Sequence, residues 1–274
     1  MKSPVPPYFD LLLQHFVPGQ SGRFVHLGHW AQSPGEEDLI QPQAFEQAQA
    51  RLNEILLGWA SLADGQAVLD VGCGLGGTLE VINQHHSNMR LYGVNIDARQ
   101  LAICEQLQAV NGNRLIWQQA DACELPFPNA SLDRVICLEA MFHFPSRRQF
   151  LQEVNRVLKP GGVFVATDMT VSSSLQGCDA PGFLFETVMQ DGYGPWPDFW
   201  QREGELDVLI HGSGLTIDQL MDASENTLPS YHFTAPGIDK ESQDPGDIAA
   251  RAALAMHWLH RQGHLRYWYL QATK

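Results

Sequence analysis

Residues Ala67-Val-Leu-Asp-Val-Gly-Cys-Gly-Leu-Gly-Gly77 join a short apolar run to a glycine-rich turn. The run predicts a buried strand, and the glycines let the backbone turn sharply and approach a ligand before a helix begins. Gly72, Gly74 and Gly77 have the G-x-G-x-x-G spacing of a dinucleotide-binding loop. Asp70, however, precedes the first glycine by two residues, where a carboxylate would repel a pyrophosphate. An ammonium group is favoured there, so the sequence predicts S-adenosylmethionine, which carries no phosphate, rather than NAD.

The composition limits the kind of protein and its partners. Of 274 residues, 44% are hydrophobic, which is enough for a substantial core. The 31 acidic and 17 basic residues give a net charge of −14, which argues against a nucleic acid or an anionic membrane surface as partner. No apolar stretch approaches the roughly 18 residues of a membrane span, and the cysteines show no C-x-x-C spacing. We therefore expect a cytoplasmic protein that acts on a small molecule, without a metal; a homodimer is one assembly that the sequence allows.

Short apolar runs alternate with helical patterns after the glycine turn. This alternation predicts an α/β fold with a parallel sheet wound with helices on both faces. Strands are predicted at 67–71, 90–94, 114–118, 132–137, 162–168, 215–221 and 264–270. Helices are predicted at 8–16, 43–60, 75–84, 98–110, 147–158, 203–211 and 247–261.

The predicted organisation is a sheet core with cover segments. Residues 1–64 are expected to form an N-terminal helical cap and residues 65–171 the cofactor-binding core. Residues 172–202, which lack a clean period, are expected to form a lid insertion, and residues 203–274 the end of the sheet with a helical cap insertion at 223–262. Ligands of an open parallel sheet lie outside the carboxyl ends of its strands, so we expect these segments to cover that edge.

Polar residues follow the second and third predicted strands. Asn95 is placed to hydrogen-bond ribose hydroxyl groups, whereas Asp97 is better interpreted as a helix cap. Asp121 could accept a proton from the amino group of an adenine; the alternative is a loop carboxylate in contact with water.

A histidine follows the fourth predicted strand. Methyl transfer from a sulfonium to a hydroxyl group requires alignment, exclusion of water and removal of a proton, and an imidazole suits the last role. His143 is the candidate general base, and the alternative is a histidine packed between Phe142 and Phe144. Glu139 is the competing acid–base group, unless it only hydrogen-bonds the amino end of the cofactor.

Two histidines three residues apart lie in the segment Val25-His-Leu-Gly-His-Trp30. Such spacing can hold a metal ion on a helix, but the intervening glycine and the missing third ligand argue against a metal site. Packing of Trp30 in a lid is the better interpretation. Aromatic residues in the cover segments predict a largely apolar substrate pocket. Its expected members are His29, Trp30, Phe142 and Trp200.

Several segments resemble the class I S-adenosylmethionine-dependent methyltransferases. Residues 68–76 resemble their cofactor loop, residues 121–128 their adenine segment, and residues 154–162 the helix exit before their fifth strand. The resemblance implies a Rossmann-like fold with seven strands and S-adenosylmethionine as cofactor. The cofactor-binding residues that it implies are Asp70, Gly72, Gly74, Asn95, Ile96, Gln100, Asp121, Ala122 and Leu138.

Three further segments, at 8–10, 26–30 and 139–144, resemble a narrower group of small-molecule methyltransferases. This group includes macrolide O-methyltransferases, the rebeccamycin sugar methyltransferase, and tocopherol and glycine-betaine enzymes. His143 matches a position that often serves as base in the group. We therefore predict transfer of the methyl group of S-adenosylmethionine to a small, largely apolar acceptor, with a hydroxyl group of a natural product favoured. A C- or N-methyltransferase, a cyclase that keeps S-adenosylmethionine as a structural cofactor and a cofactor-sensing module remain as alternatives.

Overall fold

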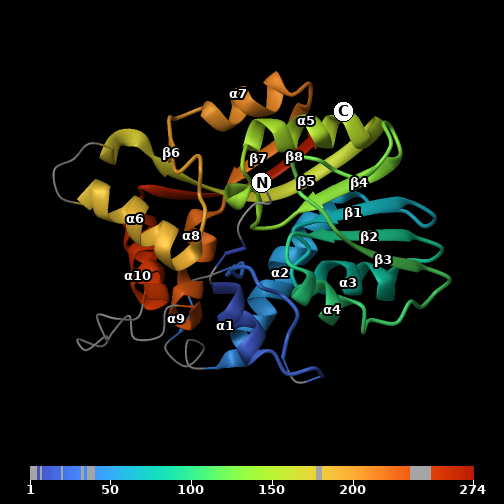
Figure 1. Cartoon of the computed structure of the whole chain (residues 1–274), viewed down its shortest axis with the longest axis horizontal. Coiled ribbons are helices and arrows are strands. Elements are labelled where there is room, and N and C mark those ends of the chain that lie inside the picture. Colours follow the sequence, from blue (N-terminus) through green and yellow to red (C-terminus); the bar gives the residue numbers. More distant parts are fainter. Residues whose placement is uncertain are drawn as a thin grey trace.

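The strands form one mixed sheet with helices on both faces (Figure 1). The computed structural model describes residues 5–6, 8–19, 21–31, 34–35, 41–176, 181–234 and 248–274. The strands are β1 (Ala67–Val71), β2 (Arg90–Asn95), β3 (Arg114–Gln119), β4 (Leu132–Cys137), β5 (Leu158–Ser172), β6 (Trp200–Gln201), β7 (Thr216–Asp222) and β8 (Leu265–Thr273). Seven of them follow the order β3-β2-β1-β4-β5-β8-β7, and β6 pairs with β5.

Five helices pack on the two faces of this sheet. They are α2 (Pro42–Ala60), α3 (Gly77–His85), α4 (Ala98–Cys104), α5 (Arg147–Val157) and α7 (Glu205–Gly212). Because side chains alternate along a strand, Val68 packs in one core cluster with Leu56 of α2, and the next residue, Leu69, packs in the other with Phe150 of α5. Figure 1 shows α5 and α7 on one side of the strands and α2, α3 and α4 on the other. No helix in the described part of the chain is long and apolar enough to cross a membrane.

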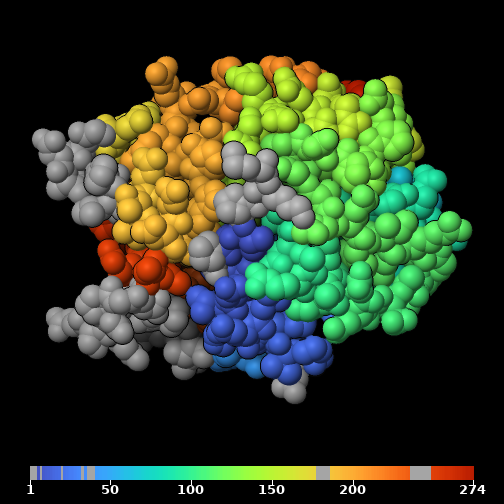
Figure 2. Space-filling model, viewed as in Figure 1, coloured from blue at the N-terminus to red at the C-terminus, as the bar shows by residue number. Residues whose placement is uncertain are grey.

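A second group of helices covers the carboxyl edge of the parallel strands. They are α1 (Tyr8–His15), α6 (Pro181–Tyr193), α8 (Ser224–Thr227), α9 (Tyr231–Thr234) and α10 (Ile248–Arg261). Helices α6 and α10 approach closely, since a Cβ on Gly192 would lie 2.3 Å from the Cβ of Ala252. In Figure 2 the N-terminal residues, in blue, lie between the green part of the core and the orange cover.

Parts of the predicted cover lie outside the described residues. They are 1–4, 7, 20, 32–33 and 36–40 of the cap, 177–180 of the insertion 172–202, and 235–247 of the segment 223–262. The last range includes Asp247, the first residue of a predicted helix, which the structure describes from Ile248.

The first four predicted strands are confirmed to within one residue, but the sheet differs from the prediction at its far side. Strand β6 lies inside the predicted insertion and pairs with the end of β5. Strand β8 runs antiparallel to β5 and β7, whereas the alternation of elements predicted a parallel sheet. The chain reaches β8 through α10, which belongs to the cover. Leu265 therefore enters the sheet beside Val171, at the carboxyl end of β5, and the strand runs back.

Two helices also differ from the prediction. The helix predicted at 98–110 ends at Cys104. Asn83 hydrogen-bonds the backbone that follows this helix. Its Nδ2 donates to the carbonyl of Gln108 and its Oδ1 accepts the N–H of Val110, so these residues are held outside a helix. Helix α6 occupies a segment without a helical period, where packing on α10 stabilises it in place of local sequence signals.

A buried ion pair joins the start of α5 to the sheet. Arg147 is 1% exposed, and its Nε donates to Oδ2 of Asp168 in β5 at 2.8 Å. Its Nη1 and Nη2 donate to the carbonyls of Asp198 and Met169. The guanidinium therefore also fixes the loop between α6 and β6.

Replacement of Arg147 by Met should lower the free energy of unfolding by about 3 to 5 kcal/mol, because Asp168 would keep an unpaired charge in the core. Denaturant unfolding at neutral pH measures this loss. The double variant Arg147→Met, Asp168→Leu removes both charges and should recover most of the loss. A cost of less than about 1 kcal/mol for the single variant, as for a surface ion pair, would contradict the assignment.

Candidate active site

The glycine turn after β1 leaves its backbone bare. Gly72 has a φ of +72° and Gly74 a φ of +52°, which glycine adopts without strain. A Cβ on Gly72 would lie 2.5 Å from the Cβ of Ala140, in the loop after β4. The N–H groups of Gly72 and Cys73 donate to the carbonyl of Val94 at 2.9 and 3.1 Å, which fixes the turn to β2. Because Gly72 and Gly74 line a cavity and carry no side chain, a ligand in that cavity can contact their main chain directly.

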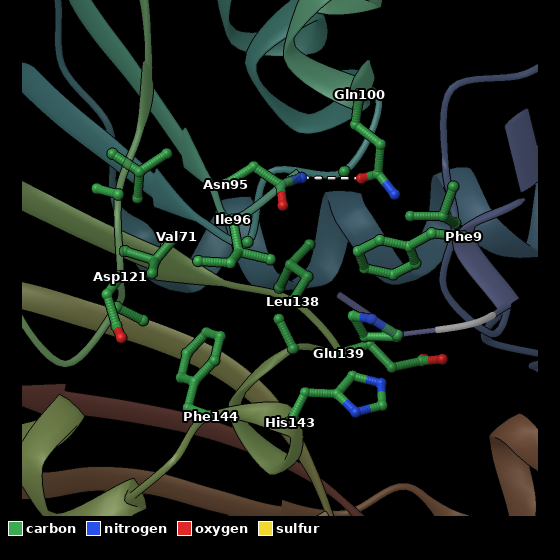
Figure 3. Close-up of a pocket in the computed structure, with 18 of the residues that line it drawn as sticks. Phe9, Val71, Asn95, Ile96, Gln100, Asp121, Leu138, Glu139, His143 and Phe144 are labelled. Atoms are coloured by element: carbon green, nitrogen blue, oxygen red, sulfur yellow. Dashed lines mark hydrogen bonds between the residues drawn. The ribbon is translucent and has the colours of Figure 1, made fainter. Parts of the chain in front are cut away.

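A cavity lies over this turn (Figure 3). We call it the cofactor cavity. Of the predicted cofactor residues, those that line it are Gly72, Gly74, Asn95, Ile96, Gln100, Asp121, Ala122 and Leu138. Glu139 and His143, the two acid–base candidates, line it as well. In Figure 3, Asn95 and Gln100 lie on one side of the cavity, and Glu139, His143 and Phe144 lie on the other.

Asp70 is buried at the end of β1 and does not line this cavity. Its side chain is 2% exposed, and within the described part of the chain its carboxylate accepts no hydrogen bond. Burial raises the pKa of Asp70 to about 7. A positive charge bound near the turn would favour the ionised form and lower that pKa.

Asn95 and Gln100 form a pair of amides in the cavity wall. Nδ2 of Asn95 donates to Oε1 of Gln100 at 2.8 Å. Nε2 of Gln100 is buried and has no hydrogen-bond partner among the described residues, so it can donate to a ligand oxygen. Asp97 caps α4, since its Oδ1 accepts the N–H of Arg99, as the helix-cap interpretation predicted.

Asp121 follows β3 and stands in the cavity wall beside Ala122. Its Oδ1 accepts the N–H of Cys123 at 2.8 Å, which holds the carboxylate in place. The side chain is half-buried rather than free in solvent.

Glu139 combines a strained backbone with a half-buried carboxylate. Its φ is +52°, which residues other than glycine rarely adopt and which is typical of functional sites. Oε2 accepts the N–H of Leu27 at 2.9 Å and the hydroxyl of Tyr267 at 2.6 Å. Burial raises the pKa of Glu139 to about 7, although both hydrogen bonds favour the ionised form.

The two ring nitrogens of His143 have different partners. Nδ1 lies 2.9 Å from the carbonyl of Pro195, which can only accept, so Nδ1 carries the proton. Nε2 is therefore an acceptor, 3.3 Å from the hydroxyl of Tyr8. Burial lowers the pKa of His143 to about 4, which keeps the ring neutral at neutral pH. The ring also packs on Phe142, with centroids 4.2 Å apart.

Helix α1 covers the cofactor cavity. Tyr8 and Phe9 line it, and Asp10 forms an ion pair of 2.6 Å with Arg99 at the start of α4. The sequence analysis placed residues 8–10 in a predicted helix of the cap and in a resemblance, but it named none of them as a site residue. The resemblance itself was the one signal that pointed to them, because two adjacent aromatic residues do not indicate what they cover.

A second cavity, of about 670 Å³, adjoins the first. We call it the apolar cavity, because most of its lining side chains, from α1, α10 and residues 24–27, are apolar. Phe142, predicted for the substrate pocket, lines it. Tyr8, Val25 and Glu139 line both cavities, so the two meet at these three residues.

Three residues predicted for the substrate pocket are not brought to either cavity. Trp30 is buried, and its Nε1 donates to Oγ of Ser230 at 3.0 Å. Nδ1 of His29 lies 3.0 Å from the hydroxyl of Tyr269. Trp200 is half-buried in β6. These side chains pack within the cover or against the sheet, which their aromatic character alone does not reveal.

The site fits S-adenosylmethionine on three observations of its own residues. The main chain of Gly72 and Gly74 lines the cavity, Gln100 Nε2 lacks a partner among the described residues, and no positive group near Asp70 lowers its raised pKa. Among the described residues, no group of three or more His, Cys, Asp or Glu side chains is arranged to hold a metal ion.

Replacement of Gly72 by Ala should weaken binding of S-adenosylmethionine by about tenfold or more, because the new Cβ would push the turn and Ala140 apart. Titration calorimetry measures the affinity. Gly65→Ala is the matched control: Gly65 also has a positive φ, +82°, but nothing lies within 4 Å of its added Cβ. Equal affinities of the two variants would show that the close approach at Gly72 does not matter.

Comparisons with known proteins identify the family of this chain. A family described as "Methyltransferase domain" matches residues 69–166. The (+)-O-methylkolavelool synthase of Herpetosiphon aurantiacus is 33% identical over 244 residues, which cover 86% of this chain and 78% of that protein. The 27-O-demethylrifamycin SV methyltransferase of Amycolatopsis mediterranei is 30% identical over 212 residues, which cover 77% and 73%.

Among solved structures, the cyclase SpnF superposes with a TM-score of 0.71 at 21% identity, covering 97% of this chain and 93% of that one. This likeness shows the fold. The family match and the two relatives, together with this fold, show that the chain belongs to the class I S-adenosylmethionine-dependent methyltransferases.

Proposed function

We propose that this methyltransferase methylates a hydroxyl group of a small, largely apolar natural product, with His143 as the general base. The observation that carries the proposal is the junction of the two cavities at Tyr8, Val25 and Glu139. Because Nε2 of His143 is 3.3 Å from the Tyr8 hydroxyl, a basic nitrogen stands at that junction.

The cofactor residues divide by chemistry. S-adenosylmethionine, when bound, supplies an electrophilic sulfonium methyl group to an oxygen nucleophile. Asp70 and the turn of Gly72 and Gly74 hold its methionine part by charge and by bare backbone. Gln100 Nε2, oriented by Asn95, donates to the ribose oxygens. Asp121 and the Ala122 N–H bind the adenine.

Ile96 and Leu138 provide the apolar remainder of the cofactor cavity wall. Both line the cavity without polar side-chain atoms, so they exclude water from the bound nucleoside.

His143 acts at the acceptor oxygen. Its Nδ1–H is held by Pro195, so Nε2 presents a lone pair at the cavity junction. The Tyr8 hydroxyl stays protonated because burial raises its pKa well above the usual value. In the free site Tyr8 donates to Nε2; an acceptor hydroxyl takes that place and gives its proton to Nε2 as the oxygen becomes methylated.

Glu139 is the second candidate for the base. It also stands at the junction, and its raised pKa of about 7 suits proton transfer near neutral pH. Oε2 already accepts two hydrogen bonds, however, which fix the position of the carboxylate.

A nitrogen or carbon acceptor, or a cyclisation, would make less use of His143 than a hydroxyl acceptor does.

The proposal includes the setting in which the enzyme works. A net charge of −14 supports a small-molecule substrate over a nucleic acid. The cytoplasmic location, the homodimer and the division at 1–64, 65–171, 172–202 and 203–274 remain predictions from the sequence.

His143→Ala should leave the affinity for S-adenosylmethionine nearly intact and lower turnover by about tenfold or more, because the acceptor would lose its base. Release of S-adenosylhomocysteine with a panel of apolar alcohols and phenols measures turnover, and mass spectrometry identifies the methyl ether. His211→Ala, on the exposed face of α7, is the matched control. Unchanged turnover in His143→Ala would remove His143 from catalysis.

The pH profile at saturating substrates separates the two bases. If His143 acts, kcat stays level through neutrality and falls as the pH drops through about 4, where the ring gains a proton. If Glu139 acts, kcat begins to fall at a higher pH, because the carboxyl of Glu139, with a pKa of about 7 in the free site, takes up a proton before His143 does. A profile of the second kind would transfer the role to Glu139.

The affinity for S-adenosylmethionine should fall as the pH drops below 7, by up to about tenfold per pH unit. Free Asp70 takes up a proton there, and a bound ammonium group requires its ionised form. Calorimetry in buffers of different ionisation enthalpy measures the affinity and the released proton. Glu139 has a similar pKa and faces the same cavity, so Asp70→Asn is the decisive variant. An unchanged pH dependence in Asp70→Asn would exclude Asp70 as its source.

A further inference from the structure

Residues 24–28 form a fixed strap beside the apolar cavity. Nε2 of Gln49 donates to the carbonyls of Phe24 and His26 at 3.2 and 2.7 Å. The N–H of Leu27 donates to Oε2 of Glu139, and the N–H of Gly28 to Oγ of Ser230 at 2.8 Å. The backbone of His26 is therefore held on both sides, and His26 is one of the residues that line the cavity.

The two ring nitrogens of His26 differ in their partners. Nδ1 lies 2.8 Å from the carbonyl of Leu27, so Nδ1 carries the proton and Nε2 is an acceptor. Nε2 has no hydrogen-bond partner among the described residues, although the residue is only 6% exposed. Burial lowers the pKa of His26 to about 4, so the ring stays neutral. A buried acceptor without a partner is costly unless a ligand or water satisfies it.

The surroundings of His26 favour an uncharged donor. Among the described residues that line the apolar cavity there is no lysine or arginine, so nothing compensates a phosphate or a carboxylate there. The carboxylate of Glu139 already accepts two hydrogen bonds at Oε2. It is therefore less suited to pair with a positively charged group on the acceptor molecule. A hydroxyl group can satisfy Nε2 at little desolvation cost.

We propose that His26 Nε2 accepts a hydrogen bond from a second hydroxyl group of the acceptor molecule, one that is not methylated. The acceptor is then an uncharged, largely apolar diol, held at His26 and methylated at the oxygen beside His143. Tyr8, whose hydroxyl lies 3.3 Å from Nε2 of His143, lines the same cavity as His26, so one molecule in that cavity can reach both histidines. This inference rests on the proposed function. It adds that the hydrogen bond to His26 decides which of the two hydroxyl groups lies beside His143 and is methylated.

The test uses three probes of one chain length: the terminal diol of octane, its mono-methyl ether and octanol. Because the octane chain is flexible, the second hydroxyl group of the diol can reach His26 without a fixed distance between the two hydroxyl groups. The mono-methyl ether has nearly the same size as the diol but lacks the second O–H donor. Calorimetry with the full chain, saturated with S-adenosylhomocysteine, should show the diol binding about tenfold tighter than the ether or octanol. His26→Leu should abolish this preference and leave octanol binding unchanged or tighter.

His260→Leu is the matched control variant. His260 is 4% exposed, its Nε2 likewise lacks a partner in the described chain, and it lines neither cavity. It should keep the preference for the diol. In the wild-type protein, nitrogen NMR should show one unprotonated imidazole signal that moves on binding of the diol but not of the ether, a readout that needs no variant.

Equal binding of diol and ether by the wild-type protein, binding of neither, or a preference that survives in His26→Leu would overturn the inference. The proposed function is judged separately by methyl ether formation and by binding of S-adenosylmethionine. If these hold while the diol preference is absent, only the role of His26 is lost. If methyl transfer fails while the preference holds, the cavity selects diols for another reaction.

Discussion

The carboxylate of Glu139 ties the cover of the site to the sheet. Its Oε2 accepts hydrogen bonds from Leu27 in the N-terminal strap and from Tyr267 in β8, and its backbone N–H donates to Oγ1 of Thr167 in β5 at 2.7 Å. The three partners belong to parts of the chain that are far apart in sequence, and Glu139 connects them through its carboxylate and its backbone. The strained φ of Glu139 turns the side chain toward them, and the same turn brings Ala140 against Gly72. The geometry of both cavities therefore follows from how the chain leaves β4.

Burial sets the charge state of the site before any ligand binds. It raises the pKa values of Asp70 and Glu139 to about 7 and lowers that of His143 to about 4, so all three groups are shifted toward their neutral forms. A bound cation reverses the shift for the two acids, because it stabilises a carboxylate. It cannot give His143 a proton, since a nearby positive charge disfavours the imidazolium. The same desolvation thus prepares two carboxylates to become charged and keeps the base unprotonated.

Local chemistry made one part of this architecture predictable. Asp70, Gly72 and Gly74 are neighbours in sequence, so charge and backbone freedom could be judged without knowing the fold, and the residues after each strand follow from the rule for open sheets. The rest depends on contacts between distant residues. Asn83 ends α4 early by binding the backbone after it, and Ser230 holds Trp30 within the cover. Tyr8 and His26 face the cavities only because the N-terminal segment folds back over the carboxyl edge, which no spacing in the sequence encodes.

The two cavities differ in what fixes their walls. Turns after the first four strands build most of the cofactor cavity, and the hydrogen bonds of the sheet set their positions. Segments of the cover build most of the apolar cavity, and some of their contacts are with one another, as where Gly192 lets α6 approach Ala252 of α10. A change in the cover can therefore reshape the acceptor space while the glycine turn stays in place. Tyr8, Val25 and Glu139 are the exception, because they belong to both walls. A substitution at any of these three residues changes the walls of both cavities, so it affects cofactor binding and acceptor binding together. Substitutions elsewhere in the apolar cavity change acceptor binding alone.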